Sequence, residues 1–240
     1  MRASPRAPAV RGTVRRRLLI NAVVDPEEAA RHLPPGLRPH VTAAGTVVGC
    51  CLLDIEHLRP APLPAPLGVA FRAAAHRISA EWENDEGELV VGVYVPERRT
   101  DSRLAVALGG RWFPGVHQPA AIVFRDTADG FTWSIRGGDF SIAARVRLRD
   151  DAASDLTCDP IAGACVGADV GLSTNHHGVL EGARMAPSAR TVHEVEVVAL
   201  DSTFIAGFAT ATPAPAYLME HVAVVWSREA APRIAKPVTS

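Results

Sequence analysis

The chain has 240 residues, a formal net charge of −1 and a hydrophobic fraction of 48%. A chain of this length buries roughly 70–75% of the surface that it exposes when unfolded, which is enough for one sizeable core. Its near-neutral charge and its aromatic content of only 5% do not favour a protein that binds nucleic acid or a membrane surface.

The termini and the cysteines indicate the compartment. Residues 1–13 are rich in Arg, Pro and Ala and lack the apolar stretch of a signal peptide. No segment approaches the roughly 20 apolar residues that cross a membrane. The cysteines form no CxxC pair, so a disulfide framework is not expected; they are Cys50, Cys51, Cys158 and Cys165. We therefore expect a cytoplasmic protein with a tail at 1–13, one domain at 14–228 and a C-terminal tail at 229–240.

The first part of the chain predicts two long strands. Residues 15–24 form the first, and Asp25 then caps a short helix that ends before Pro34-Pro35-Gly36. Residues 46–57 predict a mostly buried strand, which a Pro-rich loop follows.

A hairpin and a helix follow. Residues 71–83 alternate between two faces and pair in the prediction with 88–95 across a turn. A helix capped by Thr100 or Asp101 is predicted to run to about Leu108. One face of the first hairpin strand carries Ala74, His76, Ile78, Ala80 and Trp82.

The second part of the chain predicts mainly strands. These strands cover 117–125, 131–136, 139–149, 176–181, 190–199 and 218–226. A helical turn is expected near 202–208, and 150–172 has only weak periodicity. Because strands dominate and no regular βαβ alternation occurs, the sequence predicts an antiparallel or mixed sheet curved into a barrel rather than a Rossmann fold.

Two stretches of the sequence carry recognisable motifs. The first is RLLINAVVDPEEAARHLPPGL at 17–37, where a strand leads to an Asp-capped helix and a Leu-Pro-x-x-Leu exit. The second joins GVYVPERRTDSRL at 92–104 to the aromatic-Pro motif of GGRWFPGVH at 109–117. With these motifs the chain resembles the acetoacetate decarboxylase-like superfamily. The resemblance covers about 15–226 and is strongest toward a bacterial domain-of-unknown-function branch. It implies a mainly β (α+β) fold, a cone-shaped β-barrel of antiparallel or mixed strands with a central cavity and a few short helices.

The resemblance also allows a test of chemistry. Acetoacetate decarboxylase forms a Schiff base through a lysine directly after the aromatic-Pro pair. Here the pair is Phe113-Pro114, the next residue is Gly115, and the only lysine of the chain is Lys236 in the C-terminal tail. The resemblance also implies an acidic residue of the family pocket near position 72, where this chain has Arg72 instead. The sequence therefore predicts that Schiff-base decarboxylation is absent while a ligand cavity persists.

Arginines are the candidate carboxylate-binding residues. By the resemblance, Arg15 falls where the family places an arginine beside its substrate carboxylate; a solvated strand start is the alternative. Simple alternation predicts that Arg15 and Arg17 share a face while Arg16 points away. Arg98 and Arg103 flank the predicted helix start, where guanidinium forks can hold a small carboxylate.

For Arg98 and Arg103 the alternative is that Glu97 and Asp101 pair with them and fix the strand-to-helix turn. Tyr94 and Trp112 are candidate lining residues, with ordinary packing as their alternative.

Two histidines are candidate proton-transfer groups. His76 lies on the apolar face of its strand and would act only if that face lines the barrel interior; a satisfied core histidine is the alternative. His117 follows the Phe-Pro-Gly turn, close to where the family's reactive amine projects, and hydrogen bonding within the turn is its alternative. His176 and His177 are neighbours on a predicted strand and point apart, so no metal site and no cofactor are expected.

These residues predict a lyase or decarboxylase-type enzyme that acts on a keto-acid or polyketide-like carboxylate without a Schiff base. A non-catalytic small-molecule-binding barrel is one alternative, and a structural protein with a filled barrel is another. The expected partner is a small-molecule carboxylate or keto acid, and neither nucleic acid nor a membrane is expected. The sequence does not decide whether the protein forms a homo-oligomer.

Overall fold

The computed structural model describes residues 9–149, 159–188 and 192–232. The first elements are β1 (Val10–Val24), α1 (Pro26–Ala30), β2 (Arg38–Pro39), β3 (Val41–Thr42), β4 (Gly45–Pro60), the 3-10 helix η1 (Ala65–Leu67), β5 (Val69–Glu83), β6 (Leu89–Tyr94), β7 (Arg98–Thr100) and α2 (Arg103–Leu108). The later elements are β8 (Gln118–Pro119), β9 (Ala121–Thr127), β10 (Gly130–Gly137), β11 (Phe140–Arg147), α3 (Pro160–Cys165), β12 (Val170–Thr174), β13 (Leu180–Pro187), β14 (His193–Ser202), α4 (Thr203–Ala206) and β15 (Thr212–Glu229).

Seven of these strands close into a barrel. Their order is β1-β4-β5-β6-β12-β13-β15, and pairing between β1 and β15 completes the circle. The β6–β12 pair is parallel and its neighbours are antiparallel, so the barrel is mixed. The prediction of a mainly β, cone-shaped barrel with a few short helices is confirmed.

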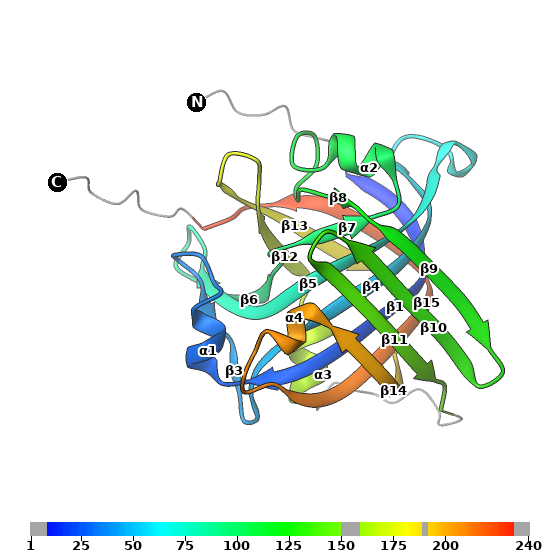
Figure 1. Cartoon of the computed structure of the whole chain (residues 1–240). Helices are drawn as coiled ribbons and strands as arrows, with labels where there is room; N and C mark the ends of the chain where they lie inside the picture. Colours follow the sequence, from blue (N-terminus) through cyan, green and yellow to red (C-terminus); the bar gives the residue numbers. More distant parts are fainter. Residues whose placement is uncertain (1–8, 150–158, 189–191, 233–240) are drawn as a thin grey trace.

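A second, four-stranded antiparallel layer branches from β15 in the order β14-β11-β10-β9. In Figure 1 this layer lies beside the barrel and crosses its outer side. A shared hydrophobic core fills the space between the two layers. It joins Leu18, Ile20, Cys50, Leu52 and Leu218 of the barrel to Phe131, Trp133, Ile135, Phe140 and Ile142 of the second layer. The barrel strands are therefore buried on their outer face as well as on their inner one.

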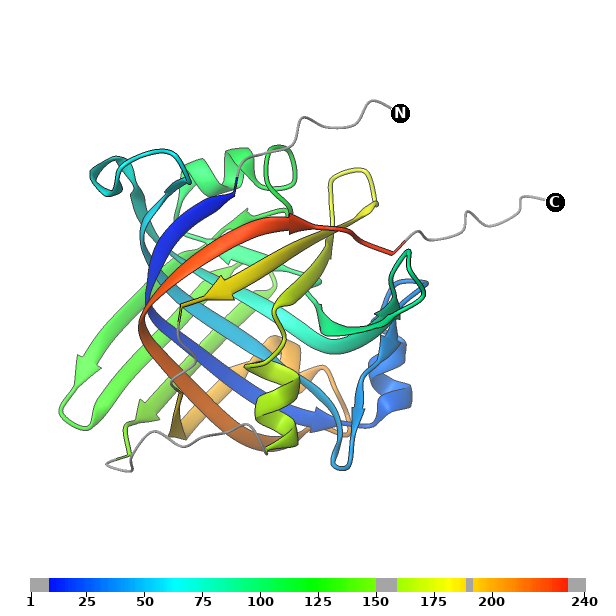
Figure 2. The ribbon, with the colours of Figure 1, turned by 180° about the vertical axis from the view of Figure 1, so that it is seen from behind.

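One end of the barrel is closed by α3, which the reverse view shows at the bottom of the molecule (Figure 2). Asp159 caps this helix by accepting a hydrogen bond from the Ile161 amide at 2.8 Å, and the Tyr217 hydroxyl donates to the same side chain. The guanidinium of Arg77 donates to the Cys165 carbonyl at 3.1 Å. A cation at a helix C-terminus is stabilising, so Arg77 holds α3 in the barrel end.

Several local predictions are confirmed and others are wrong. The predicted hairpin is the β5–β6 pair, and the three consecutive strands are β9, β10 and β11. Helix α2 is capped by Ser102 and not by Thr100 or Asp101, because Thr100 ends β7 and its hydroxyl donates to the Arg72 carbonyl.

The strand predicted at 176–181 is largely a turn, because the Asn175 side chain accepts hydrogen bonds from the His177 and Val179 amides. Strand structure also reaches into both predicted tails, since β1 begins at Val10 and β15 ends at Glu229. In the described ranges, no helix combines the length and the apolar character needed to span a membrane.

His76, a candidate proton-transfer residue, lies on the outer face of β5 and away from the cavity, so of the two alternatives its position matches that of a core histidine. Its ring stacks between Phe140, at 4.0 Å between centroids, and Phe204, at 4.3 Å. The apolar face of β5 contacts the second layer, so the alternation alone did not identify the inner face. Burial, and then the charge of Arg99, lower the pKa of His76 to about 3.

This buried histidine should make the protein acid-sensitive. Unfolded His76 titrates near pH 6.5 and the folded residue near 3, so in this window protons bind preferentially to the unfolded chain. The free energy of unfolding should therefore fall as the pH drops from 6.5 towards 3, by up to ~1.4 kcal/mol per pH unit from this residue. We expect His76→Phe to reduce the slope between pH 6 and 4 by about one proton in urea titrations. The exposed His177→Gln is the matched control, and an identical slope in His76→Phe would contradict the prediction.

Candidate functional site

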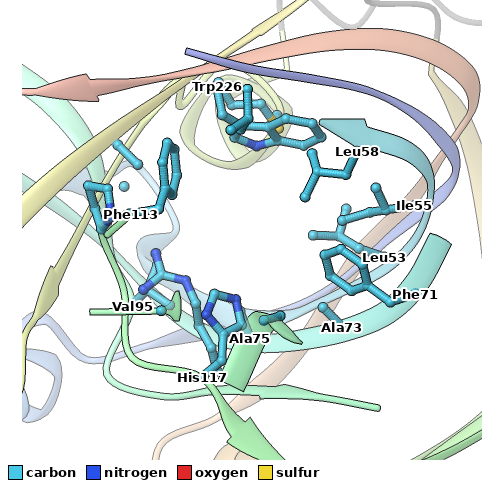
Figure 3. Close-up of a pocket in the computed structure, with 18 of the residues that line it drawn as sticks. Leu53, Ile55, Leu58, Phe71, Ala73, Ala75, Val95, Phe113, His117 and Trp226 are labelled. Atoms are coloured by element: carbon cyan, nitrogen blue, oxygen red, sulfur yellow. The ribbon is translucent and has the colours of Figure 1, made fainter. Parts of the chain in front are cut away.

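The barrel holds a cavity of about 300 Å³, and Leu104, Ala105 and Leu108 of α2 form part of its lining. Figure 3 shows Leu53, Ile55 and Phe71 on one side of its open centre and Phe113 on the other, with His117 at the edge. Apolar side chains make up most of the lining, so a bound molecule would lose much of its contact with water.

The cavity exists because the inner faces of its strands carry small residues. Ala73 and Ala75 of β5, Gly171 of β12 and Ala183 of β13 all line it. A barrel of about eight strands is normally just wide enough for its own side chains to fill. Small side chains at these inner positions leave the centre open.

The loop after α2 brings polar groups to the cavity. Gly109 ends the helix, and its amide donates to the Ala105 carbonyl at 2.9 Å. Gly115 has a φ of +96°, a conformation that L-residues with a side chain rarely adopt. The Trp112 carbonyl accepts a hydrogen bond from Arg228 at 2.9 Å. These contacts fix the loop so that Trp112, Phe113 and His117 line the cavity.

His117 is a neutral imidazole with a defined tautomer. Burial, and then the charge of Arg98, lower its pKa to about 4. Its Nδ1 lies 3.1 Å from the Gly115 carbonyl, which can only accept, so Nδ1 carries the proton. The other ring nitrogen, Nε2, is then unprotonated and can accept a proton. The predicted alternative, a hydrogen bond within the turn, is present and leaves the second nitrogen free to act.

Arg98 lines the same cavity without a partner in the described part of the chain. No hydrogen bond or ion pair joins it to a described residue, and burial lowers its pKa to about 10. The alternative was that Glu97 would form an ion pair with Arg98. Glu97 instead forms an ion pair with the neighbouring Arg99. A Cβ atom on Gly115 would lie 2.7 Å from the central carbon of the Arg98 guanidinium. The guanidinium thus occupies the space into which a side chain at 115 would extend.

The inner face carries two further arginines that the sequence did not single out as site residues. Arg17 and Arg77 line the cavity and are 7% and 4% exposed. Asp169 is the one acidic residue among the described lining residues. In the described ranges no three His, Cys, Asp or Glu side chains are placed to share a metal ion.

The structure brings three of the predicted site residues together: His117, Arg98 and Trp112 line one cavity. Their chemical roles stay predictions. His76 does not join them, because it faces the second layer. Lys236 lies outside the described residues.

Arg15 and Arg72 lie on the outer face of the barrel, which corrects their predicted placement. Both approach Asp54, at 2.8 Å and 3.7 Å respectively. A β-bulge in β1 between Val14 and Arg16 inserts one extra residue against β4, so Arg15 no longer shares a face with Arg17. A bulge has no dependable sequence signal here, so the alternation grouped Arg15 with Arg17 although only Arg17 lines the cavity.

Tyr94 and Arg103 are also outside the cavity. Tyr94 is buried on the outer face of β6, and its hydroxyl lies 3.3 Å from that of Thr174. Arg103 is the exposed first residue of α2. Its position at the helix start was predicted correctly, but the helix directs it to the surface.

Comparison with known proteins supports the fold. No protein-family model and no curated protein matches the chain. Among solved structures, acetoacetate decarboxylase from Legionella pneumophila aligns with 96% of this chain and 90% of its own, at a TM-score of 0.65 and 13% identity. An acetoacetate decarboxylase-like enzyme from Sphingomonas wittichii aligns with 93% of each chain, at 0.60 and 12%.

A third similar structure is the enduracididine biosynthesis enzyme MppR complexed with pyruvate. It aligns with 95% of this chain and 90% of its own, at a TM-score of 0.57 and 14% identity. At these identities the likeness concerns the fold. The chain therefore has the acetoacetate decarboxylase-like fold over nearly its whole length.

Proposed function

We propose that the chain binds a small keto-acid or polyketide-like carboxylate in the barrel cavity and catalyses a lyase-type reaction by proton transfer, without a Schiff base. One observation carries the proposal: the guanidinium of Arg98, which has no partner among the described residues, lies in an apolar cavity together with the neutral imidazole of His117. The pyruvate held by MppR, a protein of the same fold, supports a small keto acid as the ligand class.

Arg98 would bind the carboxylate or the carbonyl oxygen of the substrate. A guanidinium can form two parallel hydrogen bonds to the two oxygens of a carboxylate. The apolar surroundings strengthen this interaction, because electrostatic attraction grows as the local dielectric falls. The same positive charge stabilises an enolate oxygen when negative charge develops there.

His117 would act first as a base. Its Nε2 takes a proton from the carbon next to the carbonyl, and the C–H electron pair moves onto the carbonyl oxygen as an enolate. The enolate then re-forms the carbonyl and expels a β-hydroxyl group, which leaves as water after the imidazolium returns the proton. A decarboxylation is less well supported, because it ends with protonation of the enolate and the neutral Nε2 carries no proton to give.

The absence of Schiff-base chemistry is testable with acetoacetate and borohydride. A lysine is required for the imine, and the described residues contain none, while Gly115 follows the aromatic-Pro pair. We expect mass spectrometry of the treated protein to show no added mass. Lys236→Arg serves as the control, since an adduct seen in the natural chain and lost in this variant would show that Lys236 reacts and would overturn this part of the proposal.

Proton abstraction is testable without the natural substrate. We expect the protein to accelerate the exchange of the C3 hydrogens of 2-oxobutanoate with D₂O, followed by NMR. His117→Ala should lower the exchange rate by roughly 10²–10⁴-fold, the usual contribution of a general base. The rate should decline only as the pH falls through about 4, where the folded imidazole gains its proton.

His177→Gln, an exposed turn position, should leave the exchange rate unchanged. Exchange that His117→Ala does not affect would remove the proposed base. Saturable binding of 2-oxobutanoate without any acceleration would support the alternative of a non-catalytic binding barrel.

Gly115 should control ligand binding through Arg98. Gly115→Ala places a Cβ against the guanidinium and should weaken 2-oxobutanoate binding about tenfold in calorimetry, because Arg98 must move. Gly178→Ala is the matched control, since Gly178 also has a positive φ but nothing within 4 Å of its Cβ position. Equal affinities in the two variants would show that the Arg98 position does not determine binding.

A further inference from the structure

Three of the four arginines among the described lining residues, Arg17, Arg77 and Arg98, differ in their hydrogen bonds. Arg77 donates to the Asn21 side chain and to the Cys165 carbonyl at the end of α3, so it has a structural role. Among the described residues, the guanidinium of Arg17 hydrogen-bonds only the Met219 sulfur, at 3.8 Å. Its Nε, like that of Arg77, is buried without a hydrogen-bond partner. Arg98 has no hydrogen bond or ion pair to any described residue. Within the described part of the chain, Arg17 and Arg98 therefore lack an oxygen acceptor, whereas Arg77 has two.

Strand pairing places these two guanidiniums at different points of the inner wall. Arg17 of β1 pairs with Leu53, which pairs with Ala73. Arg98 of β7 pairs with Ala75, two residues further along the same strand. The positions of the two arginines are thus two residues apart along the strand direction, roughly 7 Å, and three strands apart around the barrel. Leu53, Ala73 and Ala75 lie between them and also line the cavity.

A buried guanidinium without an anion is strongly unfavourable, because its charge has lost the water that would solvate it. Asp169, the acidic residue of the described lining, acts through its charge on Arg184. Two separated cations joined by an apolar stretch are complementary to a molecule with an anionic group at each end.

We propose that the ligand of this cavity is a small dicarboxylate, with one carboxylate bound at Arg98 beside His117, the other at Arg17, and its carbon chain along the apolar residues between them. This inference rests on the proposed function and specifies its substrate class as an oxo-dicarboxylic acid. The cavity volume of about 300 Å³ suits a compact molecule of this kind.

The test compares two ligands that differ in one end group. Calorimetry on the full chain measures the binding of 2-oxoglutarate and of 2-oxopentanoate, in which a methyl group replaces the distal carboxylate. We expect the natural chain to bind 2-oxoglutarate at least tenfold more tightly. Arg17→Met should abolish this preference and leave the affinity for 2-oxopentanoate unchanged, whereas Arg98→Met should weaken the binding of both ligands.

Arg59→Met is the matched control, because Arg59 also lines the cavity but donates to the His57 and Leu63 carbonyls. It should retain the preference for the dicarboxylate. Arg17→Met should also keep or raise the thermal midpoint, because it removes an unpaired buried charge. Loss of binding together with a lower midpoint would mean that Arg17 is structural and would overturn the inference.

The remaining outcomes separate this inference from the proposed function. Equal affinity of the natural chain for both ligands would overturn the inference of a dicarboxylate ligand, and so would a preference that survives Arg17→Met. In either case, binding of 2-oxopentanoate that depends on Arg98 would still support the proposed function. Failure of the natural chain to bind either ligand would overturn both.

Discussion

The packing of the second layer against the outer face of the barrel is the interaction on which the rest of the structure depends. A seven-stranded barrel with Ala and Gly around its cavity buries less apolar area inside than a filled barrel would. The aromatic and aliphatic core between β9–β11 and the outer sides of β1, β4 and β5 supplies the buried apolar area instead. Because the strands are held from outside, their inner faces are free to be small, polar or charged.

That freedom explains why the interior has unusual electrostatics. Arg77 donates to the Cys165 carbonyl at the end of α3, while Arg17 and Arg98 have no oxygen acceptor among the described residues. Functional sites commonly retain such unfavourable charges, because a ligand of opposite charge relieves them on binding. The same burial that lowers the pKa of Arg98 also keeps His117 neutral, and the charge of Arg98 adds to that effect. The cation and the base are thus products of one environment.

The two buried histidines, His76 and His117, have similar pKa shifts but different access to the cavity. Burial lowers the pKa of both His76 and His117, so the shift alone does not identify a base. His76 is enclosed between two phenyl rings in the outer core, where no ligand can reach it. His117 lines the cavity with its Nδ1 bonded to the turn. Access, and not the titration, makes His117 the candidate.

The sequence by itself determined the mainly β architecture, the capped helix after the first strand and the loop that presents Phe113, Gly115 and His117, because hydrophobic alternation, caps and glycine turns are local signals. It also determined that almost no lysine is present. Only the tertiary structure decided which face of each strand lines the barrel. Both faces of β5 are buried, and a one-residue bulge in β1 moves Arg15 off the face that carries Arg17. The inner face therefore depends on contacts between segments far apart in the chain.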